Sequence, residues 1–192
     1  MKDVIKVSTV AFNAKWGEKE RNLNRMAGYI ETAASEGSNI IIFPEMGLTG
    51  YDDEEDKPKP EKMQYKLAET VPGKSSEVIA ELTKKLGIYA VFGLPERDPD
   101  DESKIYNAAC VCGPDGIVGS YHKIHLPYPE PHWASRGTAP FIFDTEWGPI
   151  GLGICYDTYS FPELMRYYAA KGCRLYINCT ALAKCHGIAM GS

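Results

Sequence analysis

The sequence lacks the features that mark membrane and secreted proteins. No apolar run in its 192 residues approaches the roughly 20 residues that a membrane-spanning helix needs. The N-terminus, Met1-Lys2-Asp3-Val4, alternates charged and apolar residues and is unlike a signal peptide. We therefore expect a cytoplasmic protein that does not associate with membranes.

The sequence also has little excess charge of either sign. Its 21 Lys and Arg residues against 26 Asp and Glu residues give a net charge of −5, with no long basic segment. This balance argues against binding to nucleic acid. The longest run of one sign, Asp52-Asp53-Glu54-Glu55-Asp56, lies just before two prolines, and we expect it to form a solvated loop.

Paired C-x-x-C motifs, which are typical of zinc sites, are missing as well. Of the six cysteines, Cys110 and Cys112 would share one face of a strand, and Cys173, Cys179 and Cys185-His186 do not have zinc-knuckle spacing. In a cytoplasmic protein, free thiols are favoured over disulfides. We therefore expect no metal and no other cofactor.

The segments that are present alternate between β-rich and helical patterns, without a repeat or a linker. A content of 44% hydrophobic and 24% charged residues is typical of one globular domain, here residues 1–192. We predict strands at 4–12, 39–43, 88–95, 106–112, 117–124, 141–144, 149–155 and 174–178, and helices at 18–36, 61–69, 75–86 and 161–170. Hairpin and crossover connections together indicate an α/β fold, a layered α-β-β-α sandwich with mixed sheets.

Three chemically active side chains stand at the ends of predicted strands: Glu45, Lys123 and Cys155. A thiol attacks as the thiolate, and a neighbouring lysine can lower its pKa and stabilise an oxyanion. A carboxylate can accept the thiol proton and later activate water. Together these groups support cleavage of an amide-like C–N bond through a thioester. The backbone N–H of Tyr156, the first after the cysteine, is a natural second donor to the oxyanion.

Each of the three residues also has a simpler explanation when it is taken alone. A cysteine that ends a strand is usually a small core residue. Glu45 can cap a loop, and Lys123 can protect the edge of a strand from pairing. No His/Asn or His/Asp arrangement is specified around Cys155, so a papain-like protease fits poorly.

The segments around these residues carry a more specific signal. They read Phe43-Pro44-Glu45-Met46-Gly47-Leu48-Thr49-Gly50-Tyr51, then Tyr121-His122-Lys123-Ile124-His125-Leu126-Pro127, then Gly153-Ile154-Cys155-Tyr156-Asp157 with Phe161-Pro162-Glu163-Leu164. In this order they resemble the motifs of the nitrilase superfamily of carbon–nitrogen hydrolases. The resemblance implies Glu45 as general base and acid, Lys123 as oxyanion stabiliser and Cys155 as nucleophile. Glu130 falls where the family often has a second glutamate that positions the lysine or the substrate.

The residues after the cysteine bear on the substrate. The Cys155-Tyr156-Asp157 triplet is closer to the amidase and carbamoylase branches than to true nitrilases. We expect hydrolysis of a small amide or N-carbamoyl compound with release of ammonia, with a nitrile as the alternative substrate. Tyr51, Trp133 and Asp157 are expected in the substrate pocket. Several amidase branches have a shorter insert at 158–160, sometimes with an arginine that could hold a carboxylate, and its absence here argues against an ω-amidase-like substrate.

The resemblance also sets expectations for the C-terminal part. Family members continue after the last predicted strand with a helix, more strands and a tail that dimerises, whereas this sequence stops at Ser192. We therefore expect a fold that is incomplete at the C-terminus, with lowered stability. An inactive relative or an interaction module is the alternative to an enzyme, and a glutaminase domain is another enzymatic alternative. A homo-oligomer is expected to form through the helix at 161–170.

Overall fold

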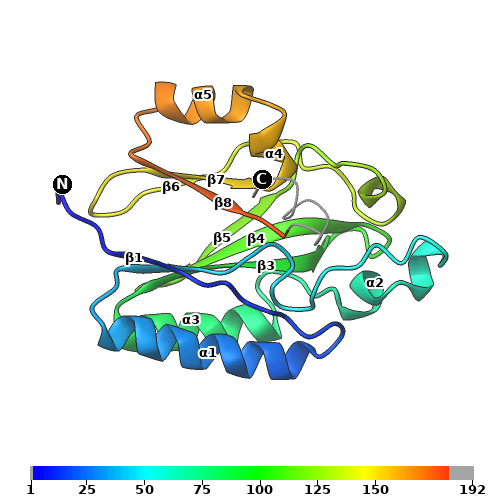
Figure 1. Cartoon of the computed structure of the whole chain (residues 1–192), viewed down its shortest axis with the longest axis horizontal. Helices are drawn as coiled ribbons and strands as arrows, with labels where there is room; N and C mark the ends of the chain where they lie inside the picture. Colours follow the sequence, from blue (N-terminus) through cyan, green and yellow to red (C-terminus); the bar gives the residue numbers. More distant parts are fainter. Residues whose placement is uncertain (1, 182–192) are drawn as a thin grey trace, which may run out of the picture.

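The computed structural model describes residues 2–181 and arranges them in four layers, helix, sheet, sheet and helix (Figure 1). This arrangement confirms the predicted α/β fold class. In chain order the elements are β1 (Val7–Thr9), α1 (Lys19–Ser35), β2 (Ile40–Ile42), η1 (Lys59–Glu61), α2 (Met63–Leu67), α3 (Lys74–Leu86), β3 (Tyr89–Arg97), β4 (Ile105–Gly113), β5 (Gly116–His122), η2 (Glu130–His132), β6 (Ile142–Phe143), β7 (Ile150–Ile154), α4 (Tyr156–Tyr159), α5 (Glu163–Ala170) and β8 (Leu175–Cys179).

The larger sheet has its strands in the order β1-β2-β3-β4-β5. The first three strands are parallel, whereas β4 is antiparallel to both β3 and β5. A turn between Gly113 and Gly116 joins β4 to β5, as its Gly-Pro-Asp-Gly sequence favours. Helices cover one face of this sheet and the second sheet covers the other, which explains why β3 and β4 are apolar and buried almost throughout.

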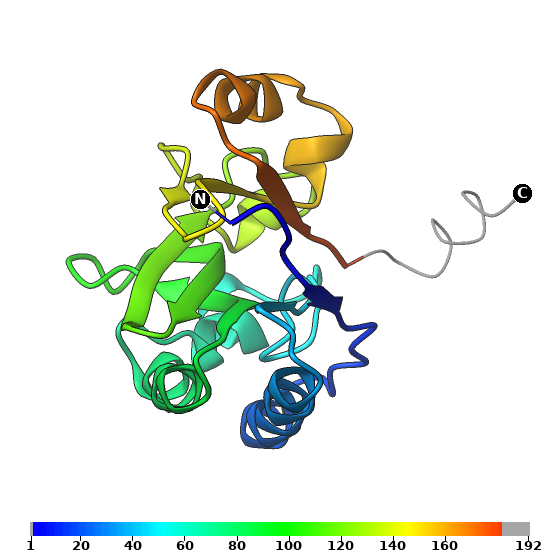
Figure 2. The same ribbon diagram turned by 90° about the vertical axis from the view of Figure 1, so that its left-hand side faces the viewer.

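The smaller sheet has the order β6-β7-β8, with β7 parallel to β8 and antiparallel to β6. Helix α5 covers its outer face, where the Tyr168 hydroxyl donates a hydrogen bond of 2.6 Å to the carbonyl oxygen of Leu152 in β7. Figure 2 shows α5 above this sheet, and α1 and α3 side by side beneath the larger one. The two sheets therefore face each other with a shared interior.

Two large apolar clusters hold the layers together. The first lies between α1, α3 and the larger sheet and includes Met26, Ile30 and Phe92. The second lies between the sheets and includes Tyr121 and Leu152. At about 25 cal/mol per Å² of buried apolar area, such clusters are the main favourable term in the stability of the fold. The second cluster also sets the distance between the two strand exits that carry Lys123 and Cys155.

The sequence-based predictions differ from the structure mainly at the ends of elements. Strand β1 spans three residues, not 4–12, because it pairs with β2 alone at the edge of the sheet. A short helix that was not predicted, α4, follows Cys155 directly. Within residues 2–181, no helix is long and apolar enough to cross a membrane. Cys185 and His186 lie outside the described residues.

Candidate active site

Glu45 lies in the turn that follows β2 and is held tightly against β3. The backbone N–H of Leu48 donates to the carbonyl oxygen of Gly93 in β3 at 3.0 Å. A Cβ atom on Gly93 would lie 2.3 Å from the nitrogen of Met46 and 2.7 Å from the Cα of Glu45. Glycine is therefore required at position 93, because only its bare backbone lets the turn approach so closely.

Lys123 directly follows β5 and is fully buried between two carboxylates. Its Nζ lies 2.7 Å from Oε1 of Glu45 and 2.6 Å from Oε1 of Glu130. Burial by itself would lower the pKa of Lys123, but the two carboxylates outweigh it and hold that pKa above its usual value. The side chain is thus a permanent cation, and its third N–H remains for another acceptor.

Glu130 comes from η2, in the proline-rich segment that follows β5. It is buried, and its Oε1 accepts hydrogen bonds from Lys123 and, at 2.6 Å, from the hydroxyl of Tyr51. Burial raises the pKa of Glu130 to about 7, against the lowering effect of Lys123. Within residues 2–181 its second oxygen, Oε2, has no hydrogen-bond partner.

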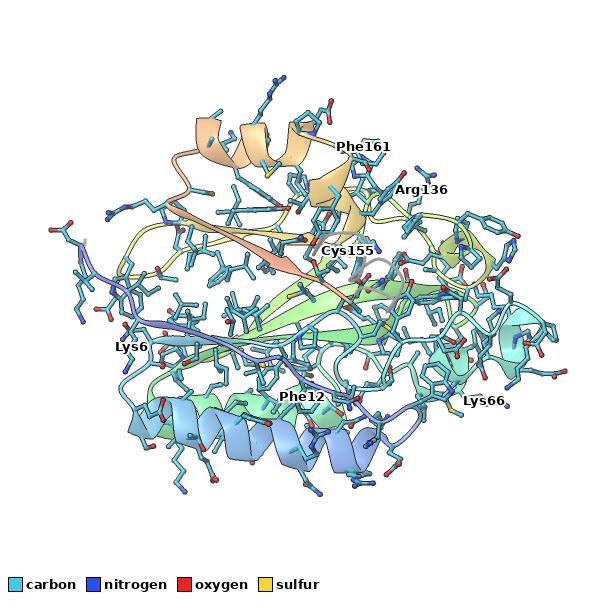
Figure 3. All side chains as sticks on the ribbon, in the orientation of Figure 1. Lys6, Phe12, Lys66, Arg136, Cys155 and Phe161 are labelled. Carbon is cyan, nitrogen blue, oxygen red and sulfur yellow. The ribbon has the colours of Figure 1, made fainter. Side chains whose placement is uncertain are left out.

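Cys155 stands between the last residue of β7 and the first turn of α4, where Figure 3 labels it between the two sheets. Its φ of +46° is unusual for a residue with a side chain and marks local strain of the kind seen at nucleophile turns. The side chain is half-buried, and its Sγ lies 4.0 Å from the carbonyl oxygen of Ala181. At the N-terminus of α4, the N–H of Tyr156 has no hydrogen-bond acceptor within residues 2–181.

The protonation state of Cys155 differs from the expectation that Lys123 would lower its pKa. Burial and the neighbouring Glu45 carboxylate raise the pKa of Cys155 to about 12, and Lys123 only partly opposes them. The resting sulfur is therefore a thiol. Deprotonation has to accompany the attack on a substrate, which makes the Glu45 carboxylate next to it an essential part of the site.

Asp157 does not occupy the substrate-binding place predicted for it. Its carboxylate is fully buried. Oδ1 accepts the backbone N–H and the ring Nδ1–H of His125 at 2.9 and 2.8 Å, while Oδ2 accepts the Tyr121 hydroxyl at 2.8 Å and the Ile154 N–H at 3.1 Å. These contacts tie the chain on either side of Lys123 to the turn that carries Cys155, so Asp157 connects the two sheets.

Trp133 also has a packing role in place of the predicted substrate contact. Its ring is fully buried in a third apolar cluster with Met46 and Leu126. Its indole N–H donates to Oδ1 of Asp53 at 2.8 Å. This bond anchors the acidic run at 52–56, which is therefore only partly solvated, contrary to the prediction from its charge.

Asn107 in β4 is a site residue that the sequence analysis missed. Its side-chain N–H donates to Oε1 of Glu45 at 2.8 Å. Its backbone carbonyl oxygen accepts the backbone N–H of Lys123 at 2.9 Å. The signal in the sequence is an amide side chain just before the apolar run Ala108-Ala109-Cys110-Val111. A buried polar side chain in a central strand needs partners, and here the partners are catalytic candidates.

A cavity of about 550 Å³ opens beside Glu45. Tyr51, Met46, Thr180 and Ala181 are among the residues that line it, together with the segment 10–14. Cys155 is not one of the lining residues. Its sulfur, however, contacts the carbonyl oxygen of Ala181, and Ala181 does line the cavity. Within residues 2–181, no three His, Cys, Asp or Glu side chains gather in a way that could hold a metal ion.

Comparison with known proteins identifies the family. The family model described as "Carbon-nitrogen hydrolase" matches residues 6–190. The chain belongs to the carbon–nitrogen hydrolase family. This confirms the resemblance to the nitrilase superfamily that the glutamate, lysine and cysteine motifs indicated.

Several relatives share about a third of the residues of this chain. The omega-amidase NIT2-B of Xenopus laevis is 35% identical over 170 residues, which cover 83% of this chain and 57% of that protein. A nitrilase of Pyrococcus abyssi is 32% identical over 171 residues, covering 88% of this chain and 62% of that protein. The chain thus spans about three fifths of the length of these curated relatives. The likeness to omega-amidases runs against our expectation from the insert at 158–160.

Solved structures agree with the fold of this chain. Nit3 of Saccharomyces cerevisiae, a member of branch 10 of the nitrilase superfamily, superposes with a TM-score of 0.82 at 31% identity, covering 96% of this chain and 67% of that one. An amidase of Nesterenkonia sp. superposes with a TM-score of 0.77 at 22% identity, covering 93% of this chain and 65% of that one, and shares the fold.

Proposed function

We propose that this protein hydrolyses the C–N bond of a small amide through a thioester on Cys155 and releases ammonia. One observation carries the proposal. A lysine is locked between two buried carboxylates on one sheet, and a half-buried thiol lies next to one of these carboxylates at an exit of the other sheet. A cation, a proton acceptor and a nucleophile then surround one reacting carbonyl group, as acyl transfer requires.

The first half of the reaction forms the thioester. Glu45 takes the proton of Cys155 while the sulfur attacks the carbonyl carbon, so that a C–S bond forms and the carbonyl π electrons move to oxygen. The third N–H of Lys123 and the backbone N–H of Tyr156 stabilise the oxyanion. When the oxyanion collapses, the C–N bond breaks and Glu45 returns its proton to nitrogen, which leaves as ammonia.

The second half regenerates the enzyme. Glu45, ionised again, removes a proton from a water molecule that attacks the thioester carbon. The same donors stabilise the second oxyanion, and its collapse breaks the C–S bond. The acid leaves, and the proton held by Glu45 returns to sulfur. Glu130 does not exchange protons with the substrate in this scheme; it holds Lys123 in place through the 2.6 Å contact.

The cavity beside Glu45 fits a small amide or N-carbamoyl compound. Its volume of about 550 Å³ is within the range of small-molecule sites. The names of the omega-amidase relatives favour the amide over the nitrile, and they bring an ω-amidase-like substrate back among the candidates. Cytoplasmic location and homo-oligomer formation remain predictions.

Ammonia release from a panel of amides, N-carbamoyl compounds and nitriles tests the proposal. We expect turnover of at least one amide, and a covalent acyl adduct on the Cys155 peptide when the reaction is quenched and analysed by mass spectrometry. Cys155→Ala is expected to lose both, whereas Cys173→Ala, which changes a cysteine two residues before β8, is the matched control that keeps them. An adduct on another cysteine, or no turnover of any compound in the panel, would count against the proposal and favour an interaction module.

A further inference from the structure

We propose that Asn107 is a positioning residue that divides the work of the Glu45 carboxylate between its two oxygens. In this inference, which rests on the proposed function, Oε1 is fixed by the lysine and the asparagine, and Oε2 alone exchanges the proton of Cys155. The assignment follows from the hydrogen bonds around the carboxylate and from the position of Ala181.

The two oxygens of Glu45 have unequal numbers of donors. Oε1 accepts the ammonium of Lys123 at 2.7 Å and the side-chain amide of Asn107 at 2.8 Å. Oε2 accepts the backbone N–H of Ala181 at 3.0 Å. Because each carboxylate oxygen offers about two lone-pair sites, Oε1 is saturated, whereas Oε2 keeps one site for a further proton.

The oxygen with the free site is also the one on the side of the cysteine. Ala181 donates its N–H to Oε2 of Glu45, and the carbonyl oxygen of the same residue lies 4.0 Å from Sγ of Cys155. One residue thus contacts both the sulfur and Oε2. The proton transfer that begins the reaction breaks the S–H bond and forms an O–H bond at Oε2, while the Lys123 contact to Oε1 stays intact.

Asn107 is placed for this role by the register of β4 and β5. Its backbone carbonyl oxygen accepts the backbone N–H of Lys123 at 2.9 Å. The same residue therefore supports the backbone of the lysine and the side chain of the glutamate. The side chain is fully buried, and its Oδ1 has no partner within residues 2–181. Burial of an unpaired amide oxygen is unfavourable, and a leucine would avoid it. A leucine, however, would leave Oε1 one donor short.

Replacement of Asn107 by leucine should therefore impair proton transfer more than binding. With a free lone pair on each oxygen and one restraint fewer, the carboxylate can rotate away from the sulfur. We expect Asn107→Leu to lower kcat about 10²-fold while KM changes less than about threefold.

Thr83→Val is the matched control. Thr83 is also fully buried and donates to the carbonyl oxygen of Gly113, at the end of the same strand, at 3.1 Å. Its replacement removes a buried hydrogen bond far from the site, so thermal stability should fall while kcat stays as in the parent protein. If Asn107→Leu behaves like Thr83→Val, the proposed role is wrong.

The alkylation rate of Cys155 by iodoacetamide at pH 7, followed by mass spectrometry, separates this inference from the proposed function. It measures proton removal from sulfur without needing an amide substrate. We expect Asn107→Leu to slow alkylation about tenfold, even if the parent protein turned over none of the tested amides. Unchanged alkylation and an unchanged kcat would overturn the inference. Should the leucine variant not fold, Asn107→Ala is measured in the same way; if neither variant folds, the role of Asn107 is structural and the inference fails.

Discussion

The two sheets contribute to the site in different ways. The larger sheet supplies Glu45, Asn107 and Lys123, all buried and joined by hydrogen bonds before any substrate arrives. The smaller sheet supplies Cys155, which is half-buried and has a strained backbone. One sheet therefore carries a rigid charged framework, and the other carries the reactive atom.

This difference shows where the site is vulnerable. The framework is fixed by strand pairing within one sheet, but the distance from the sulfur to the lysine depends on how the two sheets pack against each other. Asp157 is the main polar connection across that gap, because it binds Tyr121 of β5 and Ile154 of β7 together. We therefore expect the loss of the framework cation to cost more stability than the loss of the connection between the sheets.

Removal of the framework cation is expected to have the largest effect. Lys123→Met leaves Glu45 and Glu130 buried next to each other without a counter-charge, which should lower the free energy of unfolding by about 3–5 kcal/mol and abolish turnover. Urea unfolding and ammonia release measure the two effects. The double variant Lys123→Met/Glu130→Gln should recover part of the stability but none of the activity. A single variant as stable as the parent protein would show that the carboxylates do not need the lysine.

Loss of the connection between the sheets comes next. Asp157→Ala leaves four donors without an acceptor, from His125, Tyr121 and Ile154, and should cost about 3 kcal/mol. The alkylation rate of Cys155 should also change, because Asp157 no longer holds the turn that carries the cysteine. Tyr121→Phe removes a single donor from the same network and should cost about 1 kcal/mol. Equal costs for the two variants, measured by urea unfolding, would contradict the connecting role of Asp157.

A methyl group between Glu45 and β3 should have a smaller effect on stability. Gly93→Ala forces the turn at 44–48 away from the strand, at a cost of about 2 kcal/mol, and should lower kcat about 10²-fold because Glu45 moves. Gly28→Ala in α1 is the control, since a Cβ there meets no atom of the described residues within 4 Å. It should stabilise the helix by about 0.5–1 kcal/mol. Kinetics and thermal unfolding of both variants test the contrast.

The smallest effect expected, for a change of one pH unit, is a pH dependence of stability that originates in Glu130. Because burial raises its pKa from 4.5 to about 7, the folded state keeps a proton that the unfolded chain releases in this range. The contribution is complete below pH 4.5 and is lost as the pH rises to about 7. The free energy of unfolding should fall by no more than about 1.4 kcal/mol per pH unit across this window. Glu130→Gln should flatten the curve; an unchanged slope would assign the proton to another group.

The sequence was sufficient for the layered fold and the family, because both depend on local patterns. The sequence alone shows apolar runs of strand length, a glycine-proline turn and three short motifs. The helix at 75–86 begins slightly earlier in the structure, at Lys74, and the N–H of Gly73, the residue before it, donates to the Ser76 hydroxyl. Such shifts do not affect the positions of Glu45, Lys123 and Cys155 at the strand exits.

The partners of the site residues could not be predicted in the same way. The roles of Asn107 and Asp157 depend on strand register and on the packing of one sheet against the other. For Trp133 the sequence allowed either a place at the pocket or simple packing, and its burial against Met46 depends on the tertiary structure. The protonation of Cys155 depends on the balance between burial and two nearby charges, which only coordinates supply.

The high pKa of Cys155 has a consequence beyond the reaction itself. Peroxides and activated disulfides react with thiolates, and at neutral pH this sulfur is almost entirely protonated. The sulfur should therefore resist oxidation before a substrate binds. Reactivity arises only when a bound carbonyl group receives the electrons and Glu45 the proton, so that protonation of the resting thiol, and not a protective cover, keeps the sulfur from damage.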